Sequence, residues 1–321
     1  MTSPALRAVL ASSLALSALS FPASSQCGPE PPLGNSTGAG TVACPCFAVG
    51  ESAGAVLTAP AADYPIEITK VRIGWGSVFG GAPQSLESSI DIYPAGLPNP
   101  GTPQFSLAAP IFNDGFINEF DLDLWPGNKV ITSGPFTVAV KFANASAGNL
   151  TVPSIVHDGA GCQVGKNVIF AIPGGWNDAC ALGVTGNWVI EVDYRKAPST
   201  TVENGSGVNP TTLAASGGPT LGQPWSLTLD CTGHAPDLAL LLGHAQLAAS
   251  PVLLPSGELL LDLASPRLLK RSTTHGGAPV VFNFTLPNDV SFCGLTLYSQ
   301  GACFGAPSAQ LSNALASRVG S

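Results

Sequence analysis

Charged residues are scarce in this chain of 321 residues, since Asp, Glu, Lys and Arg together make up 10% of it and hydrophobic residues make up 45%. Disordered proteins usually combine high charge with low hydrophobicity, so we expect a folded chain. The charge that is present is acidic, with a net value of −8. We see no cluster of Lys and Arg residues in the sequence, and we therefore expect no nucleic acid partner.

Long apolar runs are missing except at the amino terminus, where residues 8–21 follow the single Arg7. That run is interrupted by serines and is too short to span a bilayer, which argues against a membrane anchor. Small residues at 23–25 follow it, as signal peptidases require, so we predict a secretory signal peptide over residues 1–25. We expect a protein that is secreted, extracellular or on the cell surface, without a membrane span.

Helical periodicity is also missing, while the chain contains 37 glycines and 29 prolines. Apolar and polar residues alternate instead with a period of two, most clearly over residues 136–142, which we expect to form a central strand. One face of this strand should be buried and the other should be wet. The buried face holds Phe136, Val138, Val140 and Phe142, and the wet face holds Thr137, Ala139 and Lys141.

Strand patterns recur along the whole chain. A phase slip near Thr69, within the alternating residues 66–75, indicates a β-bulge. Residues 238–242 are continuously apolar, and the Gly243 that ends them favours a strand over a helix fragment. The fold class is therefore all-β, with two β-sandwich domains. The predicted parts are a signal peptide (1–25), an extended lead-in (26–46), a jelly-roll-like β-sandwich (47–196), a linker (197–218) and a small carboxyl-terminal β-sandwich (219–321).

Eight cysteines lie beyond the predicted cleavage point, and in an exported chain they favour disulfides over metal ligands or a catalytic thiol. Cys162 and Cys180 bracket a hairpin-like stretch and form the best pair. Closing that loop would stabilise the fold by about 3 kcal/mol.

The other cysteines allow fewer conclusions. Cys44 and Cys46 flank a single proline and would be strained as partners, so we expect one of them to bond to Cys27. Two further cysteines, Cys293 and Cys303, sit at opposite ends of one extended run. Cys231 can therefore pair with only one of these two, and the sequence leaves the choice open.

Four short stretches of the second half combine strand-like residues with glycines: 218–225, 240–243, 294–300 and 311–315. In these stretches the second half resembles a small β-sandwich module at the carboxyl end of secreted proteins from planctomycete-type bacteria. The resemblance implies a sandwich fold and carries no established activity. The first domain is similar to other jelly-roll modules of secreted bacterial proteins.

One motif suggests catalysis. Residues 50–54, Gly-Glu-Ser-Ala-Gly, match the nucleophile elbow of esterases, and residues 275–278 resemble their oxyanion loop. An elbow needs a buried strand that turns sharply into a helix, whereas strand-like residues follow Ser52. The oxyanion loop should also precede the elbow, and His275 follows it in the other domain. We therefore expect no enzyme, and a serine hydrolase using Ser52 is the alternative.

The densest acidic patch suggests a cation site. Asn113, Asp114, Asp121 and Asp123 could offer oxygen ligands to calcium, and we expect Asp121 and Asp123 to share one strand face, although the spacing is not that of an EF-hand. A solvated strand face is the competing interpretation, and no other cofactor is expected. The four histidines are scattered without metal-ligand spacing, which argues against zinc.

Two tryptophans suggest a binding surface. Trp125 and Trp176 lie near glycine-rich turns, where flat rings could stack on sugars, although packing of a loop is the competing interpretation. Trp188 belongs to an alternating strand and should be core. The expected function is a secreted, non-enzymatic binding, adhesive or structural protein that recognises extracellular polysaccharide or a surface protein. In a further alternative, the carboxyl-terminal domain serves export or surface attachment.

Overall fold

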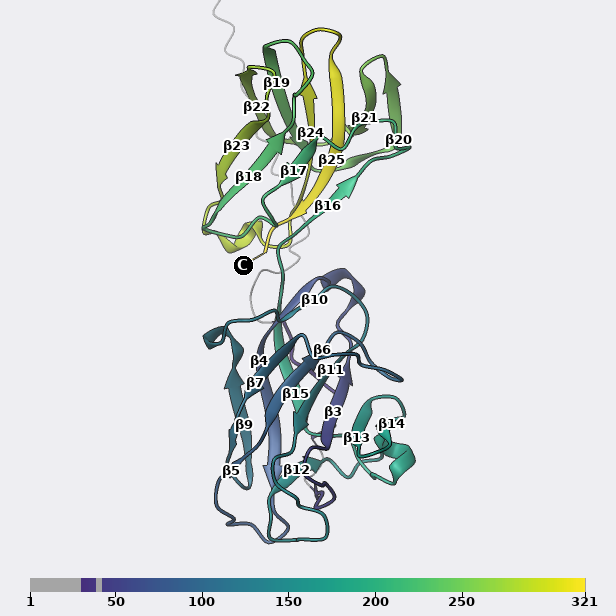
Figure 1. The fold of residues 1–321 in the computed structure, drawn as a ribbon, viewed down its shortest axis with the longest axis vertical. Coiled ribbons are helices and arrows are strands. Elements are labelled where there is room, and N and C mark those ends of the chain that lie inside the picture. Colours follow the sequence, from purple (N-terminus) through teal and green to yellow (C-terminus); the bar gives the residue numbers. More distant parts are fainter. Residues whose placement is uncertain (1–29, 39–41, 321) are drawn as a thin grey trace, which may run out of the picture.

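The computed structural model describes residues 30–38 and 42–320, which form strands joined by turns and short 3-10 segments. The predicted signal peptide and Cys27 lie outside these residues. The strands form two sandwiches, one above the other in Figure 1, and each has its own hydrophobic core. The expected all-β fold with two sandwich domains is confirmed. No helix within the described ranges has the length and apolar character that a bilayer crossing needs.

The first sandwich contains two antiparallel sheets. One has the order β1 (Leu33–Gly34), β15 (Ile190–Lys196), β4 (Ile66–Gly76), β12 (Ser154–His157) and β2 (Val42–Ala43), and β9 (Phe116–Asp121) and β10 (Val130–Ile131) also pair with β4. The other has the order β14 (Gly175–Asp178), β13 (Asn167–Ala171), β3 (Ser52–Leu57), β11 (Phe136–Lys141), β6 (Ser89–Tyr93) and β7 (Phe105–Ala108). A separate pair comprises β5 (Ser85–Leu86) and β8 (Ile111–Phe112), and the 3-10 segments are η1 (Ala61–Asp63), η2 (Leu122–Leu124) and η3 (Ala179–Leu182).

The bulge predicted near Thr69 is confirmed, because the register between β4 and β15 shifts between Asp193 and Tyr194. The bulge adds one residue, Thr69, that has no partner on β15. Without it, the apolar side chains on the two halves of β4 would point to opposite faces. With it, five of them enter one core together with Trp188, whose predicted core position is also confirmed. The five are Ile66, Ile68, Val71, Ile73 and Trp75.

The strand β11 lies inside its sheet, between β3 and β6. Its apolar face is buried as expected. The expectation of a wet opposite face is wrong for Thr137 and Ala139, which are both 0% exposed, and is right only for Lys141 at the end of the strand. The Thr137 hydroxyl donates a hydrogen bond to the Ala95 carbonyl at 2.8 Å. Beside it on β6, the Tyr93 ring packs edge-on against Trp176 of β14. A loop and a hairpin thus cover this face.

The second sandwich has a five-stranded sheet and a three-stranded sheet. The larger has the order β16 (Ser199–Glu203), β25 (Gln310–Arg318), β24 (Thr296–Cys303), β19 (Asp237–His244) and β22 (Arg267–His275). The smaller has the order β17 (Leu213–Ala215), β18 (Pro224–Leu229) and β23 (Val280–Thr285), and β20 (Leu247–Leu254) pairs with β21 (Gly257–Leu261) as a separate hairpin. One 3-10 segment, η4 (Val290–Phe292), precedes β24. The predicted strand over residues 238–242 is confirmed as part of β19.

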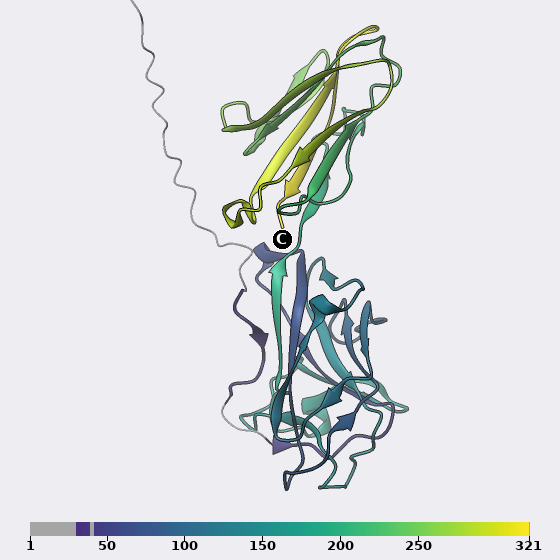
Figure 2. The same ribbon diagram turned by 90° about the vertical axis from the view of Figure 1, so that its left-hand side faces the viewer.

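The linker expected over residues 197–218 is not a linker. Within it, β16 pairs along β25 and β17 pairs along β18, so most of the segment belongs to the second sandwich. The β-branched residues of β16 suit an edge strand, which needs few large apolar side chains. Only Ala197 and Pro198 separate β15 from β16, and Figure 2 shows the chain passing directly from one sandwich to the other. The expected lead-in likewise supplies β1 and β2.

The junction is closely packed. A side chain at Gly218 or Gly320 would collide with the backbone at Pro198, so glycine is required at both positions. The Arg318 guanidinium of β25 also donates hydrogen bonds to the carbonyl oxygens of Asp63 and Tyr64 in the first sandwich, at 3.2 and 3.0 Å. These contacts join the two sandwiches.

Disulfides join Cys162 to Cys180, as the sequence predicted, and Cys231 to Cys303. The same type of bond joins Cys44 to Cys46, so the expectation that one of them bonds to Cys27 is wrong. The Cys46 N–H donates to the Cys44 carbonyl at 2.9 Å, and this tight turn places the two Cα atoms 5.3 Å apart, within disulfide reach. Cys293 is disulfide-bonded as well. Such bonds suggest an oxidising, extracellular environment.

Asp158 fastens the amino-terminal segment to the first sandwich. Its carboxylate is buried and accepts hydrogen bonds from the backbone N–H groups of Thr37 at 2.8 Å, Asn187 at 2.8 Å and Ala160 at 3.0 Å. Burial alone would raise the pKa of Asp158, but these donors outweigh burial and hold the pKa well below its ordinary value of 3.8.

We expect Asp158→Asn to lower the free energy of unfolding at pH 7 by about 3 kcal/mol, because it removes the charge from several buried hydrogen bonds. The fold depresses this pKa, so the carboxylate stabilises the protein above about pH 4 and less as the pH falls toward the folded-state pKa. The difference in free energy of unfolding between wild type and variant, measured by urea denaturation, should therefore be smaller at pH 3 than at pH 7. An equal gap at both pH values would contradict this account, and exposed Asp237→Asn is the matched control.

Candidate functional site

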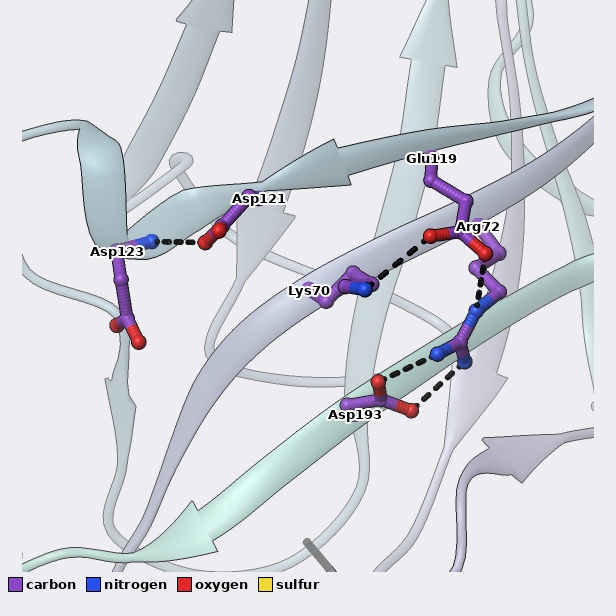
Figure 3. Close-up of polar contacts among 6 residues, drawn as sticks. All are labelled: Lys70, Arg72, Glu119, Asp121, Asp123 and Asp193. Carbon is purple, nitrogen blue, oxygen red and sulfur yellow. Dashed lines mark hydrogen bonds and ion pairs between the residues drawn. The ribbon is translucent and has the colours of Figure 1, made fainter.

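The outer face of the first sandwich carries a line of ion pairs across β9, β4 and β15 (Figure 3). The Glu119 carboxylate forms ion pairs with Lys70 and Arg72, each with an N–O distance of 3.1 Å. Arg72 also forms a two-pronged pair with Asp193, with N–O distances of 2.7 and 2.6 Å. Hydrogen bonding to Asp193 raises the pKa of Arg72, and hydrogen bonding from Lys70 lowers the pKa of Glu119. The charges of this line are therefore engaged with one another.

Asp121 and Asp123 do not share a strand face as expected. The Asp121 carboxylate caps η2 by accepting the Asp123 N–H at 3.0 Å, and Figure 3 shows the Asp123 carboxylate directed away from that of Asp121. Asp123 pairs with Arg195 at 3.1 Å, and the same guanidinium pairs with Glu67 at 2.8 Å. The strand ends at Asp121, and the 3-10 turn that follows breaks the alternation on which the expectation rested.

Asn113 and Asp114 lie at the opposite end of β9. Asp114 accepts the Ser77 N–H at 2.5 Å and the Ala82 N–H at 2.6 Å. Burial would raise the pKa of Asp114, but these bonds outweigh it and lower the pKa. Asn113 donates hydrogen bonds to the side-chain oxygen of Asn118 in β9. A six-residue strand is about 20 Å long, so the four residues expected to bind calcium do not converge.

A second group of possible metal ligands contains Cys162, Asp178 and Cys180. The two sulfur atoms are bonded to each other and are not available as thiolates. Asp178 accepts the N–H groups of Cys180 at 2.9 Å and Gly165 at 2.6 Å, which fixes the turn around the disulfide. This group has a structural role.

Trp125 follows η2, and 49% of its surface is exposed. Its backbone is held firmly, because its N–H donates to the Leu122 carbonyl at 3.0 Å. The buried Lys129 ammonium donates to the carbonyl oxygens of Leu122 at 2.9 Å and Trp125 at 2.7 Å. The same ammonium lies 5.5 Å from the centre of the Phe105 ring. An exposed aromatic ring therefore stands on a fixed backbone.

Trp176 lies on β14, in the facing sheet, and does not join Trp125. Its half-buried ring packs against Tyr93 at 5.2 Å and against Phe170 at 5.4 Å, measured between ring centres. No ring contact links the two tryptophans in the described part of the chain. Packing thus occupies Trp176, while Trp125 remains open to a ligand.

Ser52 does not occupy a nucleophile elbow. It lies in β3, 3% exposed, between Lys141 of β11 and Phe170 of β13, and the strand continues beyond it to Leu57. No hydrogen bond joins Ser52 to a histidine among residues 30–38 and 42–320. His275 is in the other sandwich, where its Nε2 lies 2.8 Å from the Phe304 carbonyl.

A groove at the loop end of the second sandwich was not predicted from the sequence. Four loops enclose about 480 Å³ there, and the lining contains no Asp, Glu, Lys or Arg. Gly and Pro in these loops are the only local signal, because they mark turns without showing that the turns meet. The polar lining residues include Asn209, Thr232, His234, Ser256, Ser308 and Gln310.

No family model and no curated protein matches the chain. Among solved structures, it is similar to a calcium-binding mutant of Bacteroides uniformis β-glucuronidase 2, with 12% identity, 83% of this chain and 26% of that chain covered, and a TM-score of 0.17. It is also similar to a Bacteroides uniformis β-glucuronidase, with 12% identity and a TM-score of 0.17. That match covers 84% of this chain and 26% of the glucuronidase chain. The chain thus spans about a quarter of these proteins, and the low TM-scores carry no argument about function.

We expect Arg72→Lys to lower the free energy of unfolding by about 1 kcal/mol, because lysine cannot form the two-pronged bond to Asp193. A double-mutant cycle with Asp193→Asn, measured by urea denaturation, should attribute this loss to the pair. Glu119→Gln is the control. It should lower the free energy of unfolding by less, because the Glu119 side chain is half-exposed and solvent screens its ion pairs. Additive effects of Arg72→Lys and Asp193→Asn would contradict the prediction.

Proposed function

We propose that the protein is a secreted, non-enzymatic binding protein that recognises an extracellular polysaccharide through Trp125. The observation that carries this proposal is the exposure of a tryptophan ring on a backbone that a buried lysine holds in place. A ring that is already fixed loses little conformational freedom when a ligand stacks on it. Binding sites commonly occupy loops that a rigid scaffold positions, and a sandwich is such a scaffold.

The surroundings of Trp125 suit a sugar better than an ion. Leu124 beside it is 77% exposed, so the ring and this side chain offer adjacent apolar surface. The apolar C–H face of a sugar ring packs on such a surface, while Asp123 and Arg195 nearby could bond to its hydroxyls. A surface protein is the other class of partner suggested by the sequence. An exposed patch with few large apolar side chains favours the sugar.

We expect Trp125→Ala to weaken binding of uncharged polysaccharides at least tenfold, and Trp125→Phe to retain most of it, because phenylalanine keeps a flat ring. Uncharged polysaccharides immobilised as an array, with the affinity of each positive measured in solution, provide the test. Trp176→Ala is the control, and it should leave affinity unchanged if thermal unfolding shows an intact fold. Equal binding by wild type and Trp125→Ala would refute the proposal, as would binding to surface proteins alone.

The alternative, a hydrolase that uses Ser52, has its own test. We expect a fluorophosphonate probe not to label the native protein at Ser52, because this residue is buried in a strand and has no hydrogen bond to a histidine among the described residues. Mass spectrometry of the probe-treated protein would locate any label. Labelling of wild type that is lost in Ser52→Ala would establish the hydrolase instead.

A further inference from the structure

The strand β22 is one edge of the large sheet in the second sandwich, since among the described strands it pairs only with β19 (Figure 1). Three cations lie on it within five residues, namely Arg267, Lys270 and Arg271, and all are exposed. In the rest of the second sandwich, the only described cation is Arg318 at the junction. The basic residues are therefore clustered after all, contrary to the sequence expectation.

These three cations have no ion pair or hydrogen bond from their side chains in the part of the chain that the structure describes. The other described arginines are all engaged: Arg72 and Arg195 pair with carboxylates, and Arg318 bonds to carbonyl oxygens. A protein with a net charge of −8 has many carboxylates available. The fold nevertheless leaves this edge uncompensated, which makes it a local site of positive potential.

The geometry of a strand selects the shape of the anion. Residues of β22 advance by about 3.4 Å each, so Arg267 and Arg271 are separated by roughly 14 Å along the edge. A small anion such as phosphate needs donors that converge on one point, and these do not converge. Lys270 and Arg271 are adjacent and point to opposite faces of the sheet. A linear polymer that runs along the edge, with a negative charge on successive units, could meet cations from both faces.

The remaining groups of β22 suit a sugar polymer. Ser272, Thr273 and Thr274 follow the cations and are exposed, so their hydroxyls can exchange hydrogen bonds with sugar hydroxyls. The outer edge of the strand also presents backbone N–H and C=O groups that none of the described strands pairs with. We propose that β22 binds a linear acidic polysaccharide, one that carries carboxylate or sulfate groups along its length.

Edge strands often carry charge simply to prevent pairing with other strands. That role would be met by charge of either sign, whereas the proposed site needs positive charge. Replacing cations by neutral residues therefore separates the two roles if binding to an anionic polymer is measured.

The experiment uses the whole protein and immobilised polygalacturonate, with neutral dextran as the second matrix. Despite its net negative charge, the wild type should be retained on polygalacturonate at low salt and released by added salt. The cations of β22 should contribute nothing to retention on dextran, which carries no charge. Lys270→Gln/Arg271→Gln should lose at least tenfold in affinity. The matched control is Lys141→Gln/Lys166→Gln, which removes the same charge from lysines of the first sandwich that are also unpaired among the described residues, and it should keep wild-type affinity.

Three outcomes would overturn the inference: no retention of wild type, equal losses in the two double variants, or tighter binding to a single-stranded oligonucleotide than to polygalacturonate. Trp125→Ala tests a different surface and should not change retention on polygalacturonate. A loss that occurs only with Trp125→Ala would place all glycan binding at the first sandwich. Lys141, Lys270 and Arg271 are exposed and Lys166 is half-buried, so thermal unfolding should confirm that each variant remains folded.

Discussion

The pairing of β4 along both edges is the constraint on which the first sandwich depends. On one edge β4 meets β15 and β12, and on the other it meets β9 and β10. Its inner face supplies Trp75 and other core side chains, and its outer face supplies Lys70 and Arg72 to the ion pairs. The bulge at Thr69 keeps these two faces distinct over the whole strand, so a single register fixes both the core and the charged surface.

Local alternation predicted the individual strands well, because the side-chain period of a strand is written into neighbouring residues. It could not predict which segment covers which face. Thr137 and Ala139 have the polar or small character of a wet face, yet a hairpin distant in the sequence covers them. The same limit applies to residues 197–218, whose composition is that of a linker and whose strands become evident only through pairing with β25 and β18.

The candidate sites were harder to predict than the fold, since a site needs side chains to converge. Asp114 and Asp121 are close in the sequence but lie at the two ends of β9, because an extended chain separates residues faster than any other regular structure. Trp125 and Trp176 are alike in sequence context, yet only the first leaves its ring open. The difference comes from Tyr93 and Phe170, which pack against Trp176 from other strands.

The two sandwiches use their few charges in opposite ways. In the first, cations and carboxylates compensate one another across β4, so the sheet can expose charged groups without attracting a charged partner to them. In the second, the cations of β22 have no ion-pair partner among the described residues, so their attraction for an anion is screened mainly by the ions in solution. In a chain with so few charged residues, the absence of compensation at one edge affects the local field more than the net charge does. The net acidity therefore describes the whole molecule poorly, and the arrangement of charge on each sheet determines which partners each sandwich can attract.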